Sequence, residues 1–359
     1  MREKYYSLDR LLKCGCHWMI LYGMRNNGKS YAVKKYCLES YIKRKEKFVY
    51  LRRWSEDIKV KDVQSYFDDM PVYDMTKGQW TGVTAYQGHF YFYNIAESGE
   101  MVRSKESLGR YLALNLMERY KSQVFKDTEN LIYEEFLTNK IYLGSNEVPE
   151  PRMLMQLVST IARDRNIKVF MIGNTISRVC PYFSEWGLKG IMQQKPGTID
   201  IYHLRGEAGV VDIAVENCEV VGTDNKMFFG LASKQIVSGE WEVNEVSKLL
   251  KPYKFYDMIY EIKVKGGEFK YIMQLMQDPD TGGAFVYIYP DTKDRKIDRV
   301  ITDAFDTDPL ISNGLMGKIK AEALIAELFR YGKYCFSDNL TGTDFKQVIG
   351  NYNLKGVIL

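Results

Sequence analysis

Residues Gly23–Ser30 read Gly-Met-Arg-Asn-Asn-Gly-Lys-Ser, a complete G-x-x-x-x-G-K-[ST] pattern. The apolar run that precedes it, Cys16–Tyr22, is typical of a strand buried on both faces of a parallel sheet. A helix-like run begins at Tyr31. Strand, loop and helix in this order are the context in which the pattern binds phosphate. The sequence therefore predicts a nucleoside triphosphate site, and the alternative is a Gly/Asn turn without a ligand.

The residue types in the loop suit phosphate binding. Its glycines allow backbone amides to turn toward the phosphates, Lys29 adds a cation near the β and γ oxygens, and Ser30 offers a hydroxyl to Mg²⁺. The helix that follows directs its positive end at the anion. We therefore expect ATP and Mg²⁺ as ligands, and expect the nucleotide to be bound by Gly23, Arg25, Asn27, Gly28, Lys29, Ser30 and Tyr31.

A second apolar run, 130–136, ends in two adjacent acids, Glu134 and Glu135. We expect Glu134 to hold Mg²⁺ through water and Glu135 to polarise the water that attacks the γ-phosphate. A P-loop kinase has no need to activate water, so the paired acids favour a hydrolase. The alternative is a solvated acidic pair that closes a strand.

A third apolar run, 167–173, stops at Asn174, which we interpret as a sensor of the γ-phosphate. Upstream of this run, a helical stretch ends near Arg163 and Arg165. A guanidinium from a neighbouring subunit can neutralise charge on the transferred phosphoryl group. The alternative for each arginine is a cation that compensates the helix dipole.

Composition bounds the class of protein. The chain has 359 residues, 45% of them hydrophobic and 14% aromatic, which suits a globular protein of two domains. Its apolar runs are shorter than a bilayer span and no signal-peptide pattern occurs, so we expect a cytoplasmic protein. The six cysteines lack zinc-ligand spacing. The net charge of +4 does not by itself indicate nucleic-acid binding, but basic residues gather within 43–61.

Apolar runs that alternate with helical stretches predict an α/β fold with a helix-covered parallel sheet, the additional-strand, RecA-like P-loop ATPase arrangement. We place this ATPase domain at residues 1–220, a linker with a helix at 221–250, and a smaller α/β domain at 251–359. Three consecutive antiparallel strands and a helix suit a ribonuclease-H-like fold for the last domain. The expected strands are 16–22, 48–51, 130–133, 167–172, 199–204, 210–215, 255–264, 269–275 and 284–289, and the expected helices follow Ser30 and cover 108–120, 153–162, 243–250 and 316–331.

Taken together, several motifs resemble one family. They are the phosphate loop with its internal Arg25, Tyr50-Leu51-Arg52-Arg53, Lys121-Ser122, the acidic pair followed by Phe136, Thr160-x-x-Arg163-x-Arg165, and Asn174 followed by Pro181-Tyr182-Phe183. The chain is similar to the DNA-packaging (encapsidation) ATPases of small short-tailed bacteriophages with protein-primed genomes, which are related to terminase large subunits.

The resemblance implies a homomeric ring, a pentamer, that docks on the portal of a preformed capsid and drives double-stranded DNA inward. It matches Lys121 and Arg163 to residues that act on a neighbour's ATP, Glu135 to the catalytic glutamate, and Asn174 to a polar partner that holds this glutamate away from water until DNA is engaged. It also implies action in the host cytoplasm, transient docking on the procapsid, absence from the mature virion, a structural RNA in some relatives, and a C-terminal nuclease-like domain without nuclease chemistry.

Two positions depart from the family pattern. Glu134 stands where the family more often has Asp, and Ser55 replaces a basic residue, so DNA contact at this loop is expected to move to Lys59 or Lys61. Nuclease chemistry would require a cluster of carboxylates that holds two metal ions, and Asp257, Glu261 and Asp278 make no compelling cluster of this kind.

Two other classes of protein stay open. A P-loop kinase would transfer phosphate to a small acceptor, and the paired acids argue against it. A nucleotide-gated DNA-binding or capsid-assembly protein would need no hydrolysis.

Overall fold

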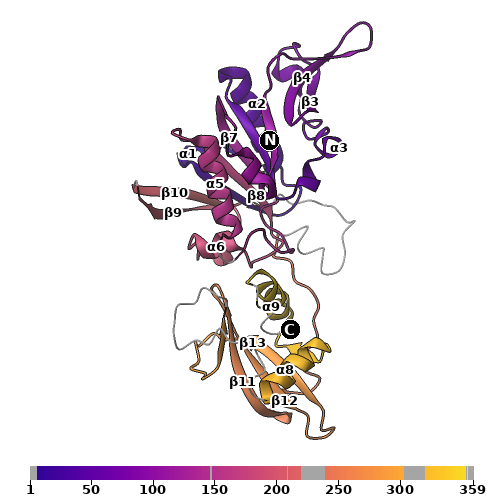
Figure 1. Cartoon of the computed structure of the whole chain (residues 1–359), viewed down its shortest axis with the longest axis vertical. Helices are drawn as coiled ribbons and strands as arrows, with labels where there is room; N and C mark the ends of the chain where they lie inside the picture. Colours follow the sequence, from indigo (N-terminus) through magenta and orange to yellow (C-terminus); the bar gives the residue numbers. More distant parts are fainter. Residues whose placement is uncertain are drawn as a thin grey trace. The chain divides into compact units, whose positions relative to one another are not determined.

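A computed structural model describes residues 6–145, 148–207, 209–219, 239–302, 320–352 and 354. The chain divides into two compact units that are interleaved in sequence. Unit 1 comprises Met1–Thr138, Glu150–Ile176 and Leu188–Glu240, and unit 2 comprises Asn139–Pro149, Ser177–Gly187 and Trp241–Leu359. Figure 1 labels the main elements of both units.

The sheet of unit 1 has a parallel centre, because its strands alternate with helices along the chain. Its order is β3-β4-β6-β2-β7-β8-β1-β10-β9, with β5 beside β4. The six neighbouring strands β6, β2, β7, β8, β1 and β10 are parallel to one another. The strands are β1 Trp18–Gly23, β2 Lys47–Arg52, β3 Gly82–Tyr86, β4 His89–Ile95, β5 Met101–Arg103, β6 Gly109–Ala113, β7 Thr128–Glu134, β8 Lys168–Asn174, β9 Thr198–Gly206 and β10 Gly209–Asn217.

Two long helices cover opposite faces of this sheet. Helix α2 (Lys29–Arg44) shares a core with Ile132 of β7, whereas Tyr133, the next residue, contacts the start of α5 (Glu150–Ala162). Successive strand residues face opposite sides, so α2 and α5 lie on different faces. The other helices of unit 1 are α1 Asp9–Lys13, η1 Ser55–Ile58, α3 Val60–Val63, α4 Val72–Met75, η2 Leu114–Tyr120 and η3 Ile191–Gln193.

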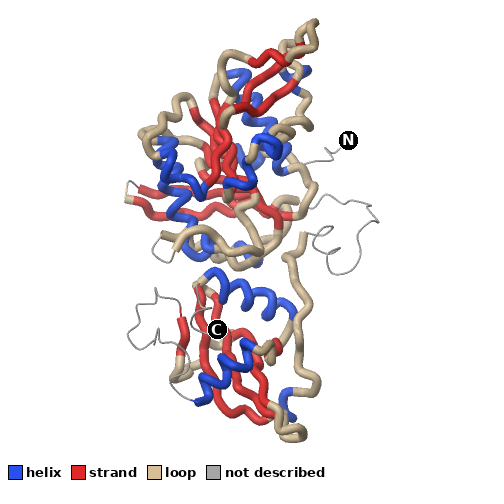
Figure 2. Tube along the Cα trace, turned by 45° about the vertical axis from the view of Figure 1, so that its right-hand side comes forward, coloured by secondary structure: helices blue, strands red, loops and turns tan. Residues whose placement is uncertain are grey.

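Unit 2 is built on the predicted three-stranded antiparallel meander, here β11-β12-β13 (strands red in Figure 2). Parallel strands extend both edges, giving the order β14-β11-β12-β13-β15. Neither edge strand, β14 nor β15, was predicted. The elements are α6 Pro181–Glu185, η4 Tyr253–Phe255, β11 Asp257–Gly266, β12 Phe269–Gln277, β13 Ala284–Pro290, β14 Val300–Thr302, α8 Lys320–Arg330, β15 Tyr334–Phe336 and α9 Asn339–Asn351.

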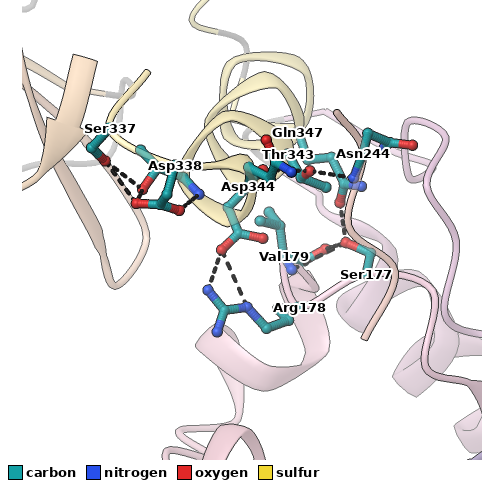
Figure 3. A network of polar contacts seen from close by, with 11 residues as sticks. Ser177, Arg178, Val179, Asn244, Ser337, Asp338, Thr343, Asp344 and Gln347 are labelled. Atoms are coloured by element: carbon teal, nitrogen blue, oxygen red, sulfur yellow. Dashed lines mark hydrogen bonds and ion pairs between the residues drawn. The ribbon is translucent and has the colours of Figure 1, made fainter. Parts of the chain in front are cut away.

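Segments that follow the central strands of unit 1 belong to unit 2 through contacts with α9. Arg178 forms an ion pair with Asp344, and the Ser177 hydroxyl donates to Gln347 Oε1 (Figure 3). The segment after β7 joins the same helix, because Tyr142 N donates to Asn351 Oδ1 at 3.2 Å.

Four expected elements differ from the structure or lie partly outside the described residues. The predicted helix 108–120 is strand β6 followed by the 3-10 helix η2. The predicted helix 243–250 is absent: this described segment is extended and bonds to other parts of unit 2, with Asn244 N donating to Thr343 Oγ1 and Ser247 O accepting from Phe336 N. Most of the predicted linker, 221–238, and the first residues of the predicted helix 316–331 lie outside the described residues.

Among the residues that the structure describes, no helix combines the length and the apolar character needed to cross a membrane.

Candidate nucleotide site

The phosphate loop connects β1 to α2 at the carboxyl edge of the parallel sheet. Gly28 has φ of 95° and Gly23 has φ of 144°, backbone conformations that favour glycine. A Cβ at Gly23 would lie 3.2 Å from the carbonyl oxygen of Cys218, so glycine also permits the close approach of this chain segment.

The loop borders a hollow of about 290 Å³. The structure brings together here the predicted lysine, serine, both acids and the sensor asparagine. The hollow is lined by Arg25, Asn26, Asn27, Gly28, Lys29, Ser30, Tyr31, Glu134, Glu135, Ile172, Gly173 and Asn174.

Lys29 is held in place by oxygen atoms of the site. It is 4% exposed, and its Nζ donates to Met24 O at 2.6 Å, Asn27 Oδ1 at 3.1 Å and Asn174 Oδ1 at 3.4 Å. Burial lowers the pKa of Lys29 to about 8. A bound polyphosphate would favour the charged form of this lysine.

Two buried polar atoms at the site have no hydrogen-bond partner among the described residues: Asn27 Nδ2 and Glu134 Oε1. Buried polar groups are normally satisfied, so each is available to a ligand. Asn27 Nδ2 is a donor that suits a phosphate oxygen, and Glu134 Oε1 is an acceptor that suits a hydrated cation.

The surroundings of Glu134 fit a magnesium ion. Burial raises the pKa of this carboxyl, while the Ser30 hydroxyl and the cations Arg52 and Lys34 lower it. Mg²⁺ typically uses one or two protein oxygens together with water and phosphate oxygens, a number that Ser30 and Glu134 can supply. In the described part of the chain, no group of three or more His, Cys, Asp or Glu side chains could hold a metal by itself.

Glu135 follows β7 with φ of 55°, a left-handed conformation, and its side chain is 61% exposed. Its carboxylate accepts from Arg52 Nη2 at 2.6 Å. Arg52 ends β2, which pairs with β7. We expected Asn174 to hold this glutamate, but in the structure Arg52 holds it and Asn174 contacts Lys29.

Sequence reasoning missed this pairing, although a signal was present. The carboxyl ends of adjacent parallel strands meet at one edge of a sheet, where a cation that ends one strand can reach an acid that ends its neighbour. The Arg52-Arg53 pair had been interpreted as part of a basic cluster and of a family motif, without a partner for either side chain.

Arg163 and Lys121 do not line the hollow. Arg163 follows α5 and precedes β8, which places it toward the amino-terminal edge of the sheet. Its Nη2 donates to Gln123 O at 3.4 Å, so it contacts the loop that follows Lys121. Lys121 itself pairs with Glu118 at 2.7 Å.

Arg165 has a structural role in the described chain. Its guanidinium donates to the carbonyl oxygens of Phe125, Thr128 and Ile161 and to the carboxylate of Glu129.

Two of the three acids considered for nuclease chemistry pair with separate cations. Glu261 pairs with Arg295 at 2.9 Å, and Asp278 pairs with Lys251 at 3.2 Å. Asp257 is exposed at the start of β11.

The strand order and the site place this chain among the P-loop ATPase folds of the additional-strand division. In that division an extra strand, here β8, lies between the strand before the phosphate loop, β1, and the strand that ends in the acidic residue, β7. More specifically, the chain belongs to the podovirus DNA encapsidation protein (Gp16) family, whose model matches residues 2–196, more than half of the chain.

Individual relatives agree with this assignment. The DNA packaging protein of Bacillus phage phi29 is 28% identical over 188 residues, which cover 50% of this chain and 48% of the relative. That of Bacillus phage B103 is 26% identical over 185 residues, covering 51% and 50%. The chain thus matches about half the length of these relatives.

Two solved structures share the fold. A chain of the phi29 viral genome packaging motor assembly aligns with a TM-score of 0.53 at 18% identity, covering 96% of this chain and 100% of that one. A chain of the phi28 DNA packaging motor aligns with a TM-score of 0.51 at 17% identity, covering 98% of each.

Proposed function

We propose that this protein is an ATP-hydrolysing ring motor that translocates double-stranded viral DNA through the portal into a preformed capsid. The observation that carries the hydrolytic part is the position of Glu135, a second acid beside the phosphate loop that a phosphate-transferring kinase would not need. The relatives' names and the motor assemblies that share the fold support the DNA-packaging part.

In this proposal each residue of the hollow has one task. Lys29 and Asn27 Nδ2 bind phosphate oxygens, Asn174 senses the γ-phosphate through its contact with Lys29, and Glu135 polarises the attacking water. When bound at Ser30 and Glu134, Mg²⁺ would neutralise charge on the β and γ oxygens.

The location of Arg163 supports a ring. Helix α5 has 13 residues and is therefore about 20 Å long, and Arg163 follows its last residue. Glu150, at the other end of this helix, lies at the edge that carries the nucleotide hollow. The arginine is thus remote from the hollow of its own subunit, so we assign Arg163 and Lys121 to the nucleotide of a neighbour in a homopentamer.

The Arg52–Glu135 ion pair supports a resting state in which the catalytic carboxylate is turned toward a cation rather than toward water. The exposed residues Lys59 and Lys61 follow Arg52 by a few positions, across the short helix η1. DNA contact at these lysines would disturb Arg52 and release Glu135. Hydrolysis would then depend on DNA.

The remaining expectations are part of the same proposal. The motor would act in the host cell while docked on the procapsid, and it would be absent from the mature virion. A structural RNA could bridge it to the capsid, as in some relatives. The C-terminal unit would have no nuclease activity, because Glu261 and Asp278 are paired with cations.

The test is steady-state ATP hydrolysis with and without double-stranded DNA, at concentrations that permit ring assembly. We expect stimulation by DNA in the wild type and loss of hydrolysis in Glu135→Gln. Glu46→Gln is a matched control, because Glu46 is also a glutamate paired with an arginine at 2.6 Å but lies outside the hollow. Assembled wild-type rings that bind ATP without hydrolysing it would instead indicate a nucleotide-gated DNA-binding or assembly protein.

A further inference from the structure

Arg53 is a buried cation directly after β2 and is 5% exposed. Three of its guanidinium nitrogens each donate a hydrogen bond to a different residue. Nη1 donates to Glu135 O at 3.0 Å, Nη2 donates to Phe136 O at 2.6 Å, and Nε donates to Glu150 Oε2 at 2.8 Å. Two of these acceptors are backbone carbonyls of the short segment that carries the proposed catalytic glutamate.

The third acceptor links this segment to α5. Glu150 is 0% exposed and is the first residue of that helix, where a negative charge is favoured by the helix dipole. Its other oxygen accepts from the Tyr133 hydroxyl at 2.6 Å, one residue before the acidic pair. The two ends of the Tyr133–Phe136 segment are thereby tied to the same ion pair.

Burial of this ion pair is poorly explained by stability alone. Replacing a buried ion pair by apolar residues of similar volume is often neutral or stabilising, because desolvation offsets the attraction. What an apolar side chain cannot supply is a set of donors in fixed geometry. The planar guanidinium fixes two carbonyls relative to each other, which a lysine ammonium does less well.

The segment needs such support because of its backbone. Glu135 has φ of 55°, a conformation that costs a non-glycine residue on the order of 1 kcal/mol or more and persists where the surroundings enforce it. The Arg53 bonds to the carbonyls of Glu135 and Phe136 enforce it here. The result is a carboxylate that borders the nucleotide hollow.

We propose that Arg53 is a positioning residue for ATP hydrolysis: it fixes the backbone of Glu135 and Phe136 and, through Glu150, ties that backbone to the start of α5. This inference rests on the proposed function. It also gives α5 a second role, because the residue after this helix is Arg163, assigned above to a neighbouring subunit. A single rigid helix, α5, would then help to position both the catalytic glutamate of its own subunit and the arginine that acts on the next subunit.

The first test replaces Arg53 by lysine, which keeps the charge and loses the planar fork. A displacement of about 1 Å at a catalytic group costs on the order of 100-fold in rate, so we expect kcat to fall by about that factor. The dissociation constant of ATP should stay the same, because Arg53 does not line the hollow. Hydrogen exchange of peptides that cover 134–137 should become faster, a readout independent of hydrolysis.

Arg299→Lys is the matched control. Arg299 likewise pairs with a buried glutamate, Glu322 at 2.8 Å, within unit 2. We expect it to lower stability and to leave kcat and exchange at 134–137 unchanged.

A second variant separates positioning from packing. Arg53→Met, Glu150→Leu and Tyr133→Phe together replace both charges of the ion pair, and the hydroxyl that contacts it, by apolar groups. If the cluster only stabilised the fold, this folded triple variant would hydrolyse ATP at the wild-type rate, which would overturn the proposal. We expect it to bind ATP and remain slow.

Failure of the two proposals can be distinguished. Wild-type rings without hydrolysis would contradict the motor, whereas active wild type with an equally active, folded Arg53→Lys variant would contradict positioning only.

Discussion

Lys29 shows how one buried residue can set the pH range of nucleotide binding. Its ammonium is surrounded by neutral oxygens of Met24, Asn27 and Asn174, and burial lowers its pKa to about 8. Phosphate binding requires the charged form. Above pH 8 the free protein therefore has to take up a proton when ATP binds.

Lys29 therefore predicts how the affinity for ATP depends on pH. The apparent affinity for ATP should be constant below pH 7 and should weaken above pH 8, approaching about tenfold per pH unit. The dissociation constant of a fluorescent ATP analogue between pH 6.5 and 9.5 measures it. Lys29→Arg, which stays charged over this range, should bind with little pH dependence. A wild-type dissociation constant that is flat up to pH 9.5 would contradict the assigned pKa.

Among the elements, β6 is the clearest departure from expectation. Its residues Gly109–Ala113 had been included in a predicted helix. In the structure β6 pairs with β2 on one side and β4 on the other, and a Cβ on Gly109 would collide with the carbonyl oxygen of Phe48. Tertiary pairing overrides local propensity here.

Gly109→Ala distinguishes strand from helix by the sign of its effect. In a helix, alanine would raise the free energy of unfolding by up to about 1 kcal/mol. In the observed strand it should lower this free energy by about 1–3 kcal/mol, because backbone atoms must move. Gly350→Ala is the control. Gly350 lies in α9, and a Cβ there would have its nearest neighbouring atom, Ile141 Cγ1, at 3.9 Å, so alanine should raise the free energy of unfolding. Thermal unfolding of both variants gives the answer.

The elements predictable from sequence were those with a strong local signal. Apolar runs predicted β1, β2, β7 and β8, and the meander of unit 2 followed from strands separated by glycine-rich turns. The β3–β4 hairpin was missed because its turn, Gln87-Gly88, lacks the usual Asn-Gly or Asp-Gly signal, although both residues have positive φ.

The site was predictable to the same degree. Motif spacing identified most of the residues that line the hollow, since these lie at the ends of apolar runs, but Gly23, Lys121 and Arg163 do not line it. The partners Arg52 and Glu150 were not identified in their observed contacts. Arg52 is 83 positions from Glu135 and Glu150 is 97 from Arg53, and pairs so distant in sequence are set by the order of the strands rather than by any local pattern.

At the scale of the whole molecule, the two units are interleaved along the sequence, so that neither is a single continuous stretch of chain. Residues 139–149 and 177–187 come after strands β7 and β8, which end at Glu134 and Asn174, yet they belong to unit 2. The Arg178–Asp344 ion pair is one contact that joins such a segment to α9 (Figure 3).

Removal of Arg178 tests this attachment. Burial raises the pKa of Asp344, and Arg178 opposes that rise. Arg178→Met should therefore leave a buried carboxylate and lower the free energy of unfolding at pH 7 by about 1–3 kcal/mol. A group whose pKa is raised in the folded state favours folding when protonated, so the loss should shrink as the pH falls below the raised pKa.

The second change Asp344→Asn removes the buried charge and should restore part of the stability at pH 7. Denaturant unfolding at neutral and acidic pH measures both effects. Equal losses at the two pH values, without recovery in the double variant, would contradict the buried-charge account.

The ring is the central claim, and subunit mixing tests it most directly. In the proposed arrangement, a Lys29→Ala subunit cannot use its own site but can offer Arg163 to a neighbour, whereas an Arg163→Ala subunit has the reverse defect. DNA-stimulated ATP hydrolysis should therefore be higher in rings assembled from both variants than the sum of the two variants measured separately. Hydrolysis no higher than that sum, in rings shown by mass to contain both kinds of subunit, would contradict an arginine that acts between subunits.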